Sequence, residues 1–357
     1  MTKTKIIAFY LPQFHPIPEN DEWWGKDFTE WTNVRKAKPL FWGHEQPKIP
    51  ADLGYYDLRD EEARIAQAEM AKEAGIEGFC YWHYWFGNGK RLLEKPFNEV
   101  LASGKPDFPF CLGWANHSWE KKTWQPGNNN TLLIEQTYNG IEDHTAHFYA
   151  MLDAFKDNRY IRVNNKPLFL IWSPADLPNS NEFITLWNKL AIENGLEGFY
   201  FIAYTVSSTS PSQLIEFGYD AISVDLLVEC FKNRNLFKRI NFRILRYLLS
   251  VPRIVNYDEY ANYFIRKINF DNSVLPVVVP NFDHSPRSGK RGIVLKNSTP
   301  KKFERLLTRL LEKMQINPNS EKLIFIKSWN EWGEGNYLEP DTKFGKKYLE
   351  VIKKIVK

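Results

Sequence analysis

Apolar and polar positions follow two different periods along the chain, and the two periods predict different elements. The runs at 168–172 and 275–279 are apolar at consecutive positions, which is typical of strands in a parallel sheet covered on both faces. Residues 301–314 instead place apolar side chains at i, i+3, i+4 and i+7, the rhythm of an amphipathic helix. Strands are predicted at 5–11, 78–84, 110–115, 168–172, 199–204, 221–224, 275–279 and 323–327, and helices at 61–74, 92–103, 143–155, 182–193, 211–217, 258–268, 301–314 and 346–355.

Eight strands alternating with eight helices predict a (β/α)8 TIM barrel, with the active face at the carboxyl ends of the strands. A doubly wound sheet is the competing fold, but no glycine-rich phosphate loop follows the first strand. No linker or low-complexity tract interrupts the sequence, so residues 1–357 are expected to form a single domain. The long loops 12–60, 116–140 and 225–257 follow predicted strands, and long loops at that face usually carry function.

Composition narrows the class of protein. A hydrophobic content of 43% is enough for a large core, and a net charge of +4 lacks the strong basic bias of nucleic-acid binding proteins. The three cysteines show no paired spacing, so no disulfide framework is expected. The first apolar run is too short for a secretory signal, and no stretch approaches the ~20 apolar residues of a membrane span. We therefore expect a cytoplasmic protein.

The strongest chemical signal is the segment 324–340, where an apolar strand runs into Trp, Asn and Glu residues. Glu331 and Glu334 are three residues apart, so a helical turn would place both side chains on one face, whereas a strand would point them to opposite faces. Gly333 and Gly335 suit a tight turn. Two solvated loop carboxylates are the plain alternative, but an unpaired charge among these aromatic rings would be costly. We predict Glu331 and Glu334 as catalytic residues.

Aromatic and polar side chains also gather just beyond the predicted strand ends, where ring faces and polar rims match the two surfaces of a sugar. An isolated Trp is more often core packing, which is the interpretation preferred for Trp172 and Trp187. Along the second strand the side chains alternate, so one of Trp82, His83 and Tyr84 must face the helix layer, and His83 is as compatible with a structural role as with ligand contact. The predicted substrate-binding residues are Tyr10, His15, Trp23, Trp24, Trp31, Trp82, His83, Trp114, Asn116, Tyr204, Asn281, Trp329, Asn330, Trp332 and Tyr337.

Metal and cofactor sites find little support. His144 and His147 are three residues apart, but on a predicted helix outside the barrel, and Asp283 with His284 has no further candidate ligand. We predict neither a metal nor a cofactor. Glu339, just before Pro340, is interpreted as structural.

Five segments together resemble a known family. Residues 7–15, 23–25, 28–33, 78–85 and 328–335 are similar to the WbsX-type proteins of bacterial surface-polysaccharide loci, a glycoside hydrolase family 99-like group. The resemblance implies a retaining endo-α-mannosidase-like enzyme on a (β/α)8 barrel. It implies Glu331 as the general base that deprotonates the sugar 2-hydroxyl, Glu334 as the general acid, and a 1,2-anhydro sugar intermediate. Glu334 would then have to be protonated at neutral pH.

One segment departs from the family pattern. Residues 113–119 read Gly-Trp-Ala-Asn-His-Ser-Trp, where the related sequences carry an acid and an amide in place of His117 and Ser118. This changes charge and hydrogen bonding near the expected cleft, so the substrate is expected to differ even if the chemistry is kept.

Three functions remain open, all with an oligosaccharide or polysaccharide partner and none with nucleic acid. The first is a glycoside hydrolase of O-antigen or capsule polysaccharide metabolism. The second is a glycosyltransferase of lipopolysaccharide biosynthesis, and the third is a non-catalytic carbohydrate-binding barrel. Segment 232–253 interleaves basic and apolar residues, which suits either peripheral contact with the inner membrane surface or a helix folded over the barrel rim.

Overall fold

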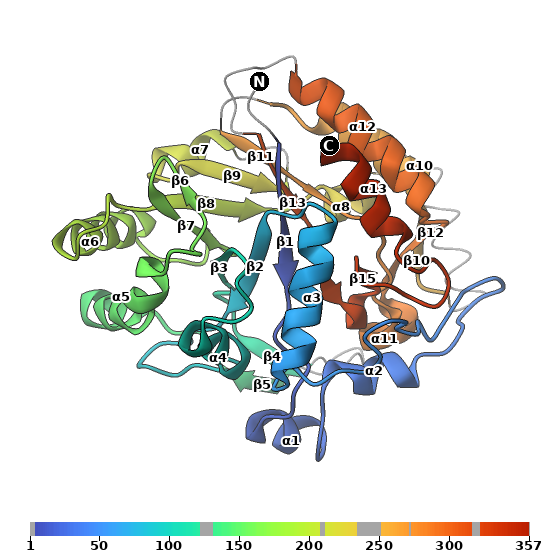
Figure 1. The fold of residues 1–357 in the computed structure, drawn as a ribbon, viewed down its shortest axis with the longest axis horizontal. Coiled ribbons are helices and arrows are strands. Elements are labelled where there is room, and N and C mark those ends of the chain that lie inside the picture. The colour runs from blue at the N-terminus through green and yellow to red at the C-terminus, as the bar shows by residue number, and fades with distance from the viewer. Residues whose placement is uncertain are drawn as a thin grey trace. The chain divides into compact units, whose positions relative to one another are not determined.

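The computed structural model describes residues 4–121, 131–207, 211–233, 251–270, 273–315 and 322–356. Within these residues the chain has the predicted (β/α)8 barrel fold, in which parallel strands alternate with helices along the sequence (Figure 1). By contacts it divides into two compact units. We call the chain up to Phe79, 206–209 and the chain from Val224 onward the terminal unit, and Cys80–Thr205 with 210–223 the central unit. The expectation of a single domain stays a prediction.

The terminal unit is built on three parallel strands. β13 (Leu323–Ile326) lies between β1 (Lys5–Tyr10) and β11 (Val274–Val278), with Lys5 opposite Leu323 in the first pair. All three strands are almost entirely buried, which explains their consecutive apolar residues. The helices of this unit that the sequence predicts are α3 (Glu61–Glu73), α10 (Tyr257–Lys267), α12 (Pro300–Gln315) and α13 (Lys347–Val356).

The central unit repeats the same alternation. β7 (Lys166–Ile171) pairs in parallel with β3 (Phe110–Trp114) on one side and with β8 (Tyr200–Thr205) on the other. The short strand β6 (Arg162–Val163) runs antiparallel to β7. Its helices are α4 (Lys95–Ser103), α5 (Gly140–Lys156), α6 (Ser180–Glu193) and α7 (Pro211–Glu216). Strands β2 (Gly78–His83) and β9 (Ala221–Val224) each begin in one unit and end in the other.

Trp187 shows how the helix layer of the central unit is held. Its side chain on α6 is fully buried, its ring packs on Phe169 of β7 at 4.8 Å between centroids, and its Nε1 donates to the backbone oxygen of His144 on α5. The prediction of core packing for Trp187 is therefore confirmed.

Several short elements between the predicted strands and helices were not predicted. They are helices α1 (Pro18–Trp24), α2 (Glu30–Lys36), α8 (Leu227–Lys232) and α11 (Ser285–Ser288), the parallel pair β10 (Arg253–Asn256) and β12 (Ile293–Lys296), and the hairpin β4 (Trp119–Lys121) and β5 (Thr131–Ile134). Elements of three to seven residues are too short to show a clear period. α2 does have a local signal, since Thr29 accepts from the Trp31 N–H and forms a capping box with Thr32.

Segment 232–253 suited either contact with a membrane surface or a helix folded over the barrel rim, and its residues 234–250 lie outside the described residues. In the part of the chain that is described, no helix has the length and apolar character needed to cross a bilayer.

Candidate active site

The two glutamates lie on a tight turn that follows the last barrel strand. Glu331 ends β14 (Asn330–Glu331), Trp332–Glu334 form a single 3-10 turn, and β15 (Asn336–Tyr337) returns antiparallel to β14. Side chains at i and i+3 of a 3-10 turn eclipse one another. The predicted helical turn is confirmed, and it directs both carboxylates to one side.

Arg287 of α11 joins the two carboxylates. Its Nη1 lies 3.2 Å from Oε1 of Glu331 and 2.7 Å from Oε1 of Glu334, while its Nε donates to Oε2 of Glu30 at 3.0 Å. Because one nitrogen contacts both oxygens, these oxygens are at most about 6 Å apart, closer to the ~5–5.5 Å carboxyl spacing of retaining glycosidases than to the ~6.5–9.5 Å of inverting ones.

Two glycines make this arrangement possible, for different reasons. A Cβ on Gly333 would lie 1.8 Å from Oε2 of Glu30 and 2.9 Å from Nε of Arg287, so no side chain fits beside this ion pair. Gly335 has φ +51°, and a Cβ there would lie 2.7 Å from Cβ of Asp283. The first glycine therefore provides space, and the second provides both space and a left-handed turn.

A lysine and a histidine also lie close to Glu331 and Glu334. Lys327, just after β13, donates to Oδ2 of the buried Asp225 at 3.1 Å, and Nε2 of His284 lies 3.4 Å from Oε1 of Glu334. Burial alone would lower the pKa of Lys327, but Asp225 and the two glutamates raise it above its usual value. Lys327 is therefore charged at neutral pH.

The two carboxyls titrate far apart. Burial, and then the charge of Glu334, raises the pKa of Glu331 to about 7. Burial would also raise the pKa of Glu334, but Arg287, His284 and Lys327 outweigh it and hold that pKa well below its usual value. Two interacting acids with separated pKa values are typical of an acid–base pair. Glu331 therefore binds a proton more readily than Glu334, the reverse of the order that the family resemblance implies.

The side chain of Glu339 stabilises the turn by hydrogen bonds. Its carboxylate accepts hydrogen bonds from Tyr56 Oη at 2.9 Å, Gln67 Nε2 at 2.6 Å and Trp332 Nε1 at 2.6 Å. Gln67 in turn accepts from the Tyr10 hydroxyl at 2.7 Å. Burial raises the pKa of Glu339 to about 7, because its three hydrogen bonds compensate only part of the desolvation. These contacts agree with the structural role predicted for Glu339.

Two asparagines fix the loop to its neighbours by pairs of hydrogen bonds. Asn330 accepts from the Leu11 N–H at 2.8 Å and donates to the Leu11 oxygen at 3.0 Å. Asn281 makes the same pair with the Tyr337 backbone, at 2.9 and 3.0 Å. The side-chain amides of Asn330 and Asn281 hydrogen-bond to backbone groups of the protein, so they position the turn.

Most predicted sugar-binding residues of the terminal unit form the wall around this turn. Tyr10, His15, Trp31, Trp329, Trp332 and Tyr337 are at most 5% exposed. Trp332 stacks on Tyr337 with 3.7 Å between ring centroids, and Trp31 donates from Nε1 to the Tyr56 oxygen at 2.7 Å. Trp23 and Trp24 lie on α1, where Trp24 is 41% exposed. Contact of these rings with a sugar stays a prediction.

The central unit gathers aromatic rings at its strand ends. Trp172, just after β7, stacks on Tyr204 of β8 at 4.2 Å between centroids and meets Trp82 of β2 edge-on at 5.1 Å. His117, after β3, lies 6.4 Å from the Trp172 ring. We call Trp82, His117, Trp172 and Tyr204 the aromatic cluster. Trp172 was expected to be core packing, but it is only half-buried and carries the centre of this cluster.

Three other predicted residues of the central unit are bonded within the protein. His83 points into the helix layer, where its Nε2 lies 2.8 Å from Nε2 of His147 on α5, so the alternation predicted for this strand is confirmed. Burial lowers the pKa of both imidazoles. Trp114 donates from Nε1 to the Trp85 oxygen, and the Asn116 side chain bonds both backbone groups of Ser173. Within the described residues no group of three or more His, Cys, Asp or Glu is arranged to hold a metal ion.

Sequence reasoning missed the cations of the site. Arg287 lies in a four-residue helix after the seventh strand, where nothing in the local pattern distinguishes it from a surface arginine. Lys327 had a usable signal, because a lysine directly after an apolar strand is unusual unless it reaches a partner at the strand end. Glu30 lies within segment 28–33, but its own sequence neighbourhood does not indicate that it is buried against Arg287.

Solved structures support the fold. A GH99 endo-alpha-mannosidase from Bacteroides thetaiotaomicron superposes with a TM-score of 0.58 at 16% identity, covering 98% of this chain and 95% of that one. The same enzyme in complex with bis-tris-propane gives 0.59 at 15% identity, covering 99% and 96%. A protein described as glycoside hydrolase-like gives 0.56 at 16% identity, covering 100% and 95%.

Sequence comparisons identify the family. The uncharacterized protein WxcX of Xanthomonas campestris pv. campestris, from strains B100 and ATCC 33913, is 36% identical over 359 residues. The match covers 98% of this chain and 49% of the relative, so the chain spans about half the length of the curated relatives it matches. The model of the family described as glycosyltransferase WbsX matches residues 6–352. The chain therefore belongs to the glycosyltransferase WbsX family.

Proposed function

We propose that the protein is a carbohydrate-active enzyme that cleaves α-linked, mannose-type glycans of a bacterial surface polysaccharide with retention of configuration. The observation that carries the proposal is the bridge of Arg287 between Glu331 and Glu334, which keeps one oxygen of each partly buried carboxylate within about 6 Å of the other, as a retaining pair requires. Fold neighbours named as endo-alpha-mannosidases support the substrate class.

In the proposed reaction Glu331 removes the proton of the sugar 2-hydroxyl, whose oxygen attacks the anomeric carbon of the same ring. The bond to the leaving oxygen breaks, and Glu334 donates its proton to that oxygen. Water then opens the resulting 1,2-anhydro sugar: Glu334 takes a proton from the water, and Glu331 returns one to the 2-oxygen. Two inversions at the anomeric carbon give net retention, and both glutamates end in their initial states.

This sequence requires the proton of the pair to be on Glu334 when the sugar is bound. In the free protein Arg287, 2.7 Å away, disfavours protonation of Glu334. A sugar that enters between the carboxylates must displace this guanidinium from Glu334. Losing that contact would raise the pKa of Glu334 and move the shared proton from Glu331. Arg287 therefore acts as a positioning residue that couples substrate entry to the protonation state.

The pKa of about 7 at Glu331 also favours the opposite assignment, with Glu331 as general acid. A glycosyl fluoride separates the two, because fluoride leaves without a proton. We expect Glu331→Gln to lose both release of fluoride and turnover of a native-type α-mannan oligosaccharide. Glu334→Gln should lose oligosaccharide turnover but still release fluoride in the first turnover, because only the later opening of the 1,2-anhydro sugar needs Glu334. The exchanged pattern would assign the acid to Glu331. Glu312→Gln, on the exposed side of α12, is the matched control.

A carbohydrate-binding barrel without catalysis is tested by the same variants. Loss of at least ~10²-fold in turnover is expected for each glutamate variant. Full turnover in either one would remove that residue from the mechanism.

Glycosyl transfer is the second candidate, favoured by the description of the matching family. Incubation with an α-mannan oligosaccharide, and separately with labelled nucleotide sugars plus an acceptor glycan, distinguishes the two reactions. Product formed only from nucleotide sugars would overturn the hydrolase proposal. Products longer than the starting oligosaccharide, without any nucleotide, would indicate transglycosylation by the same acid pair.

Location in the cytoplasm and peripheral contact with the inner membrane through 232–253 also stay proposals. The membrane contact is tested by flotation with anionic liposomes before and after charge reversal at Lys238, Arg239 and Arg243. Absence of binding at low salt would end the membrane proposal.

A further inference from the structure

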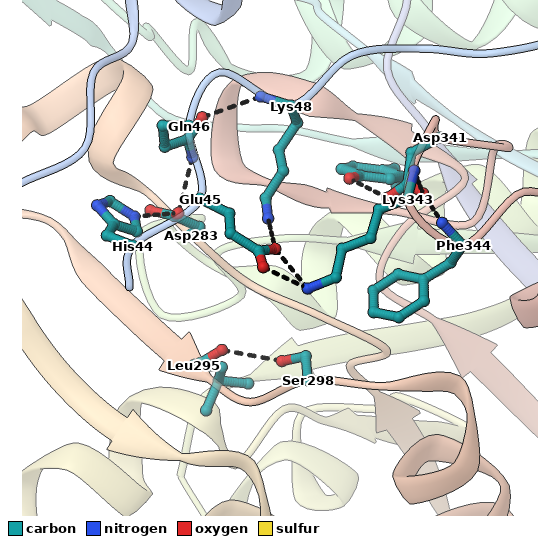
Figure 2. Close-up of polar contacts among 11 residues, drawn as sticks. His44, Glu45, Gln46, Lys48, Asp283, Leu295, Ser298, Asp341, Lys343 and Phe344 are labelled. Atoms are coloured by element: carbon teal, nitrogen blue, oxygen red, sulfur yellow. Dashed lines mark hydrogen bonds and ion pairs between the residues drawn. The ribbon is translucent and has the colours of Figure 1, made fainter. Parts of the chain in front are cut away.

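A hollow lies in the terminal unit beside the turn that carries the acid pair, with Gly335 and Tyr337 in its wall. Its cavity volume is about 200 Å³, and it is lined by the loop 41–48, the turn between β12 and α12, and the chain around 341–348. Figure 2 shows the loop residues Glu45 and Lys48 facing Lys343, with Ser298 on another wall. Glu331, Glu334 and Arg287 do not line it. We call it the lysine pocket.

The carboxylates of the lysine pocket are already satisfied. Glu45 binds both Lys343 and Lys48, at 2.5 and 3.6 Å. Asp283 accepts from Gln46 Nε2 and bonds His44 Nε2, each at 2.7 Å (Figure 2). Their lone pairs therefore face protein donors and do not repel an incoming anion strongly.

Asp341 is satisfied in the same way. It accepts from the Tyr337 hydroxyl at 2.8 Å and from the backbone N–H groups of Lys343 and Phe344 at 3.0 and 2.6 Å. Each of the three acids in the pocket wall thus has its own donors.

One of the lysines that line the pocket has no carboxylate partner among the described residues. Lys302 pairs at 2.7 Å with Asp258, which lies outside the pocket wall. Lys296 has no carboxylate partner among the described residues, and its Nζ lies 5.6 Å from the centre of the Phe41 ring. Lys48, Lys302 and Lys343 each have a carboxylate partner, so among the four lysines of the wall the ammonium of Lys296 is available to an anionic ligand.

An unsatisfied hydroxyl lines the same pocket. Tyr348 is 2% exposed, and its hydroxyl has no hydrogen-bond partner within the described part of the chain. The side chain that approaches this hydroxyl is Asn281, whose amide bonds the Tyr337 backbone and makes no hydrogen bond of normal geometry with Tyr348. A buried hydroxyl without a partner is unfavourable, and a ligand oxygen would remove that cost.

Aromatic faces complete the pocket. Phe41, Phe282 and Phe344 line it, and Trp42 on the same loop is 96% exposed. Apolar faces beside a donor hydroxyl and a free ammonium match a pyranose ring that carries a negative charge. A bare inorganic anion would leave the aromatic faces unused.

We propose that the lysine pocket binds an anionic sugar unit, carrying a carboxylate or a phosphate, of the glycan that the acid pair cleaves. Lys296 pairs with the charged group, Tyr348 donates to a sugar oxygen, and Phe41 packs on the ring. The inference rests on the proposed function for its link to catalysis, and it adds that the substrate polysaccharide is acidic.

The test measures binding of D-glucuronate, D-glucose 6-phosphate, D-glucose and inorganic phosphate by NMR titration of the full chain. Both anionic sugars are expected to bind at least about tenfold more tightly than glucose, a difference of ~1.4 kcal/mol. Whichever of the two binds more tightly identifies the charged group. If glucose binds with the same affinity as glucuronate, the proposal is wrong. If inorganic phosphate binds with the same affinity as glucose 6-phosphate, the pocket recognises the anion alone and the proposed sugar contacts are wrong.

Two variants locate the binding. Lys296→Ala is expected to weaken binding of the anionic sugars about fivefold or more, with the exposed Lys353→Ala on α13 as the matched control. Tyr348→Phe removes only the unpartnered hydroxyl, so binding should weaken about threefold while the melting temperature stays equal or rises. Unchanged affinity in both variants would overturn the site.

A third variant separates this inference from the proposed function. Glu331→Gln should bind the anionic sugars like the wild type while losing turnover. Wild-type sugar binding together with full turnover in this variant would remove the catalytic proposal and leave the pocket standing.

Discussion

The terminal and central units have the same alternation of strands and helices, but different kinds of side chain follow the ends of their strands. In the terminal unit the strand ends carry charges, with Glu331, Glu334 and Arg287 held by mutual ion pairs. In the central unit they carry rings, with Trp172 between Trp82 and Tyr204. Buried charges need partners placed within tenths of an ångström, whereas stacked rings tolerate variation. The terminal unit should therefore be sensitive to small changes, and the central unit should adapt.

The largest effect is expected from the smallest substitution, Gly333→Ala. Its methyl would overlap Oε2 of Glu30, so the Glu30–Arg287 pair and both catalytic carboxylates must shift. A displacement of about 1 Å commonly costs ~10²-fold in rate, which turnover of an α-mannan oligosaccharide would detect. Gly104→Ala, where a Cβ meets nothing within 4 Å, is a control for an added methyl group, although its φ of +72° adds some backbone strain.

Arg287→Met should follow, with a loss of turnover of about 10- to 10²-fold. Removing the guanidinium leaves Glu30, Glu331 and Glu334 without their shared cation, so the pKa of Glu334 should rise. The measurement is the pH dependence of kcat/KM, whose acidic limb should move to higher pH. Arg305→Met, whose ion pair with Asp258 is exposed, should leave the profile unchanged. An unshifted acidic limb in Arg287→Met would contradict the control of the pair by this cation.

Glu339 gives a pH-dependent effect on stability. Because burial raises its folded-state pKa to about 7, above the unfolded value, it contributes stability that is complete below about pH 4.5 and is lost as the pH rises through 7. For a shift of this size the change amounts to about 3 kcal/mol. Urea unfolding of Glu339→Gln between pH 5 and 8 should show a shallower fall in the free energy of unfolding than the wild type. Glu331 contributes in the same direction in both proteins.

The smallest effect is expected in the aromatic cluster. Trp172→Ala should raise KM about three- to tenfold and leave kcat nearly unchanged, because a ring that packs on a sugar contributes ~0.5–1.5 kcal/mol to binding. Trp187→Ala in the core of the same unit is the contrast, since it should instead lower the melting temperature strongly. A large fall in kcat for Trp172→Ala would break the distinction between a charged catalytic unit and an adaptable ring-bearing unit.

The limits of sequence reasoning can be seen in particular residues. The turn at 332–334 was predictable, because glycines and two glutamates three residues apart leave few arrangements that bury them together. His83 was predictable only as an alternative, since alternation says that some side chain faces outward but not which. Arg287 was not predictable, because its role depends on Glu30, which is 257 residues away in the sequence.

The sequence by itself determined the order of strands and helices, the family, and the turn that carries Glu331 and Glu334, because periodicity and local turn chemistry depend on neighbouring residues. Only the tertiary structure decided which cations meet the two carboxylates, which of them holds the proton, and which rings are buried. Electrostatic energy depends on distance and burial in space, and contacts between residues far apart in the chain leave no local pattern.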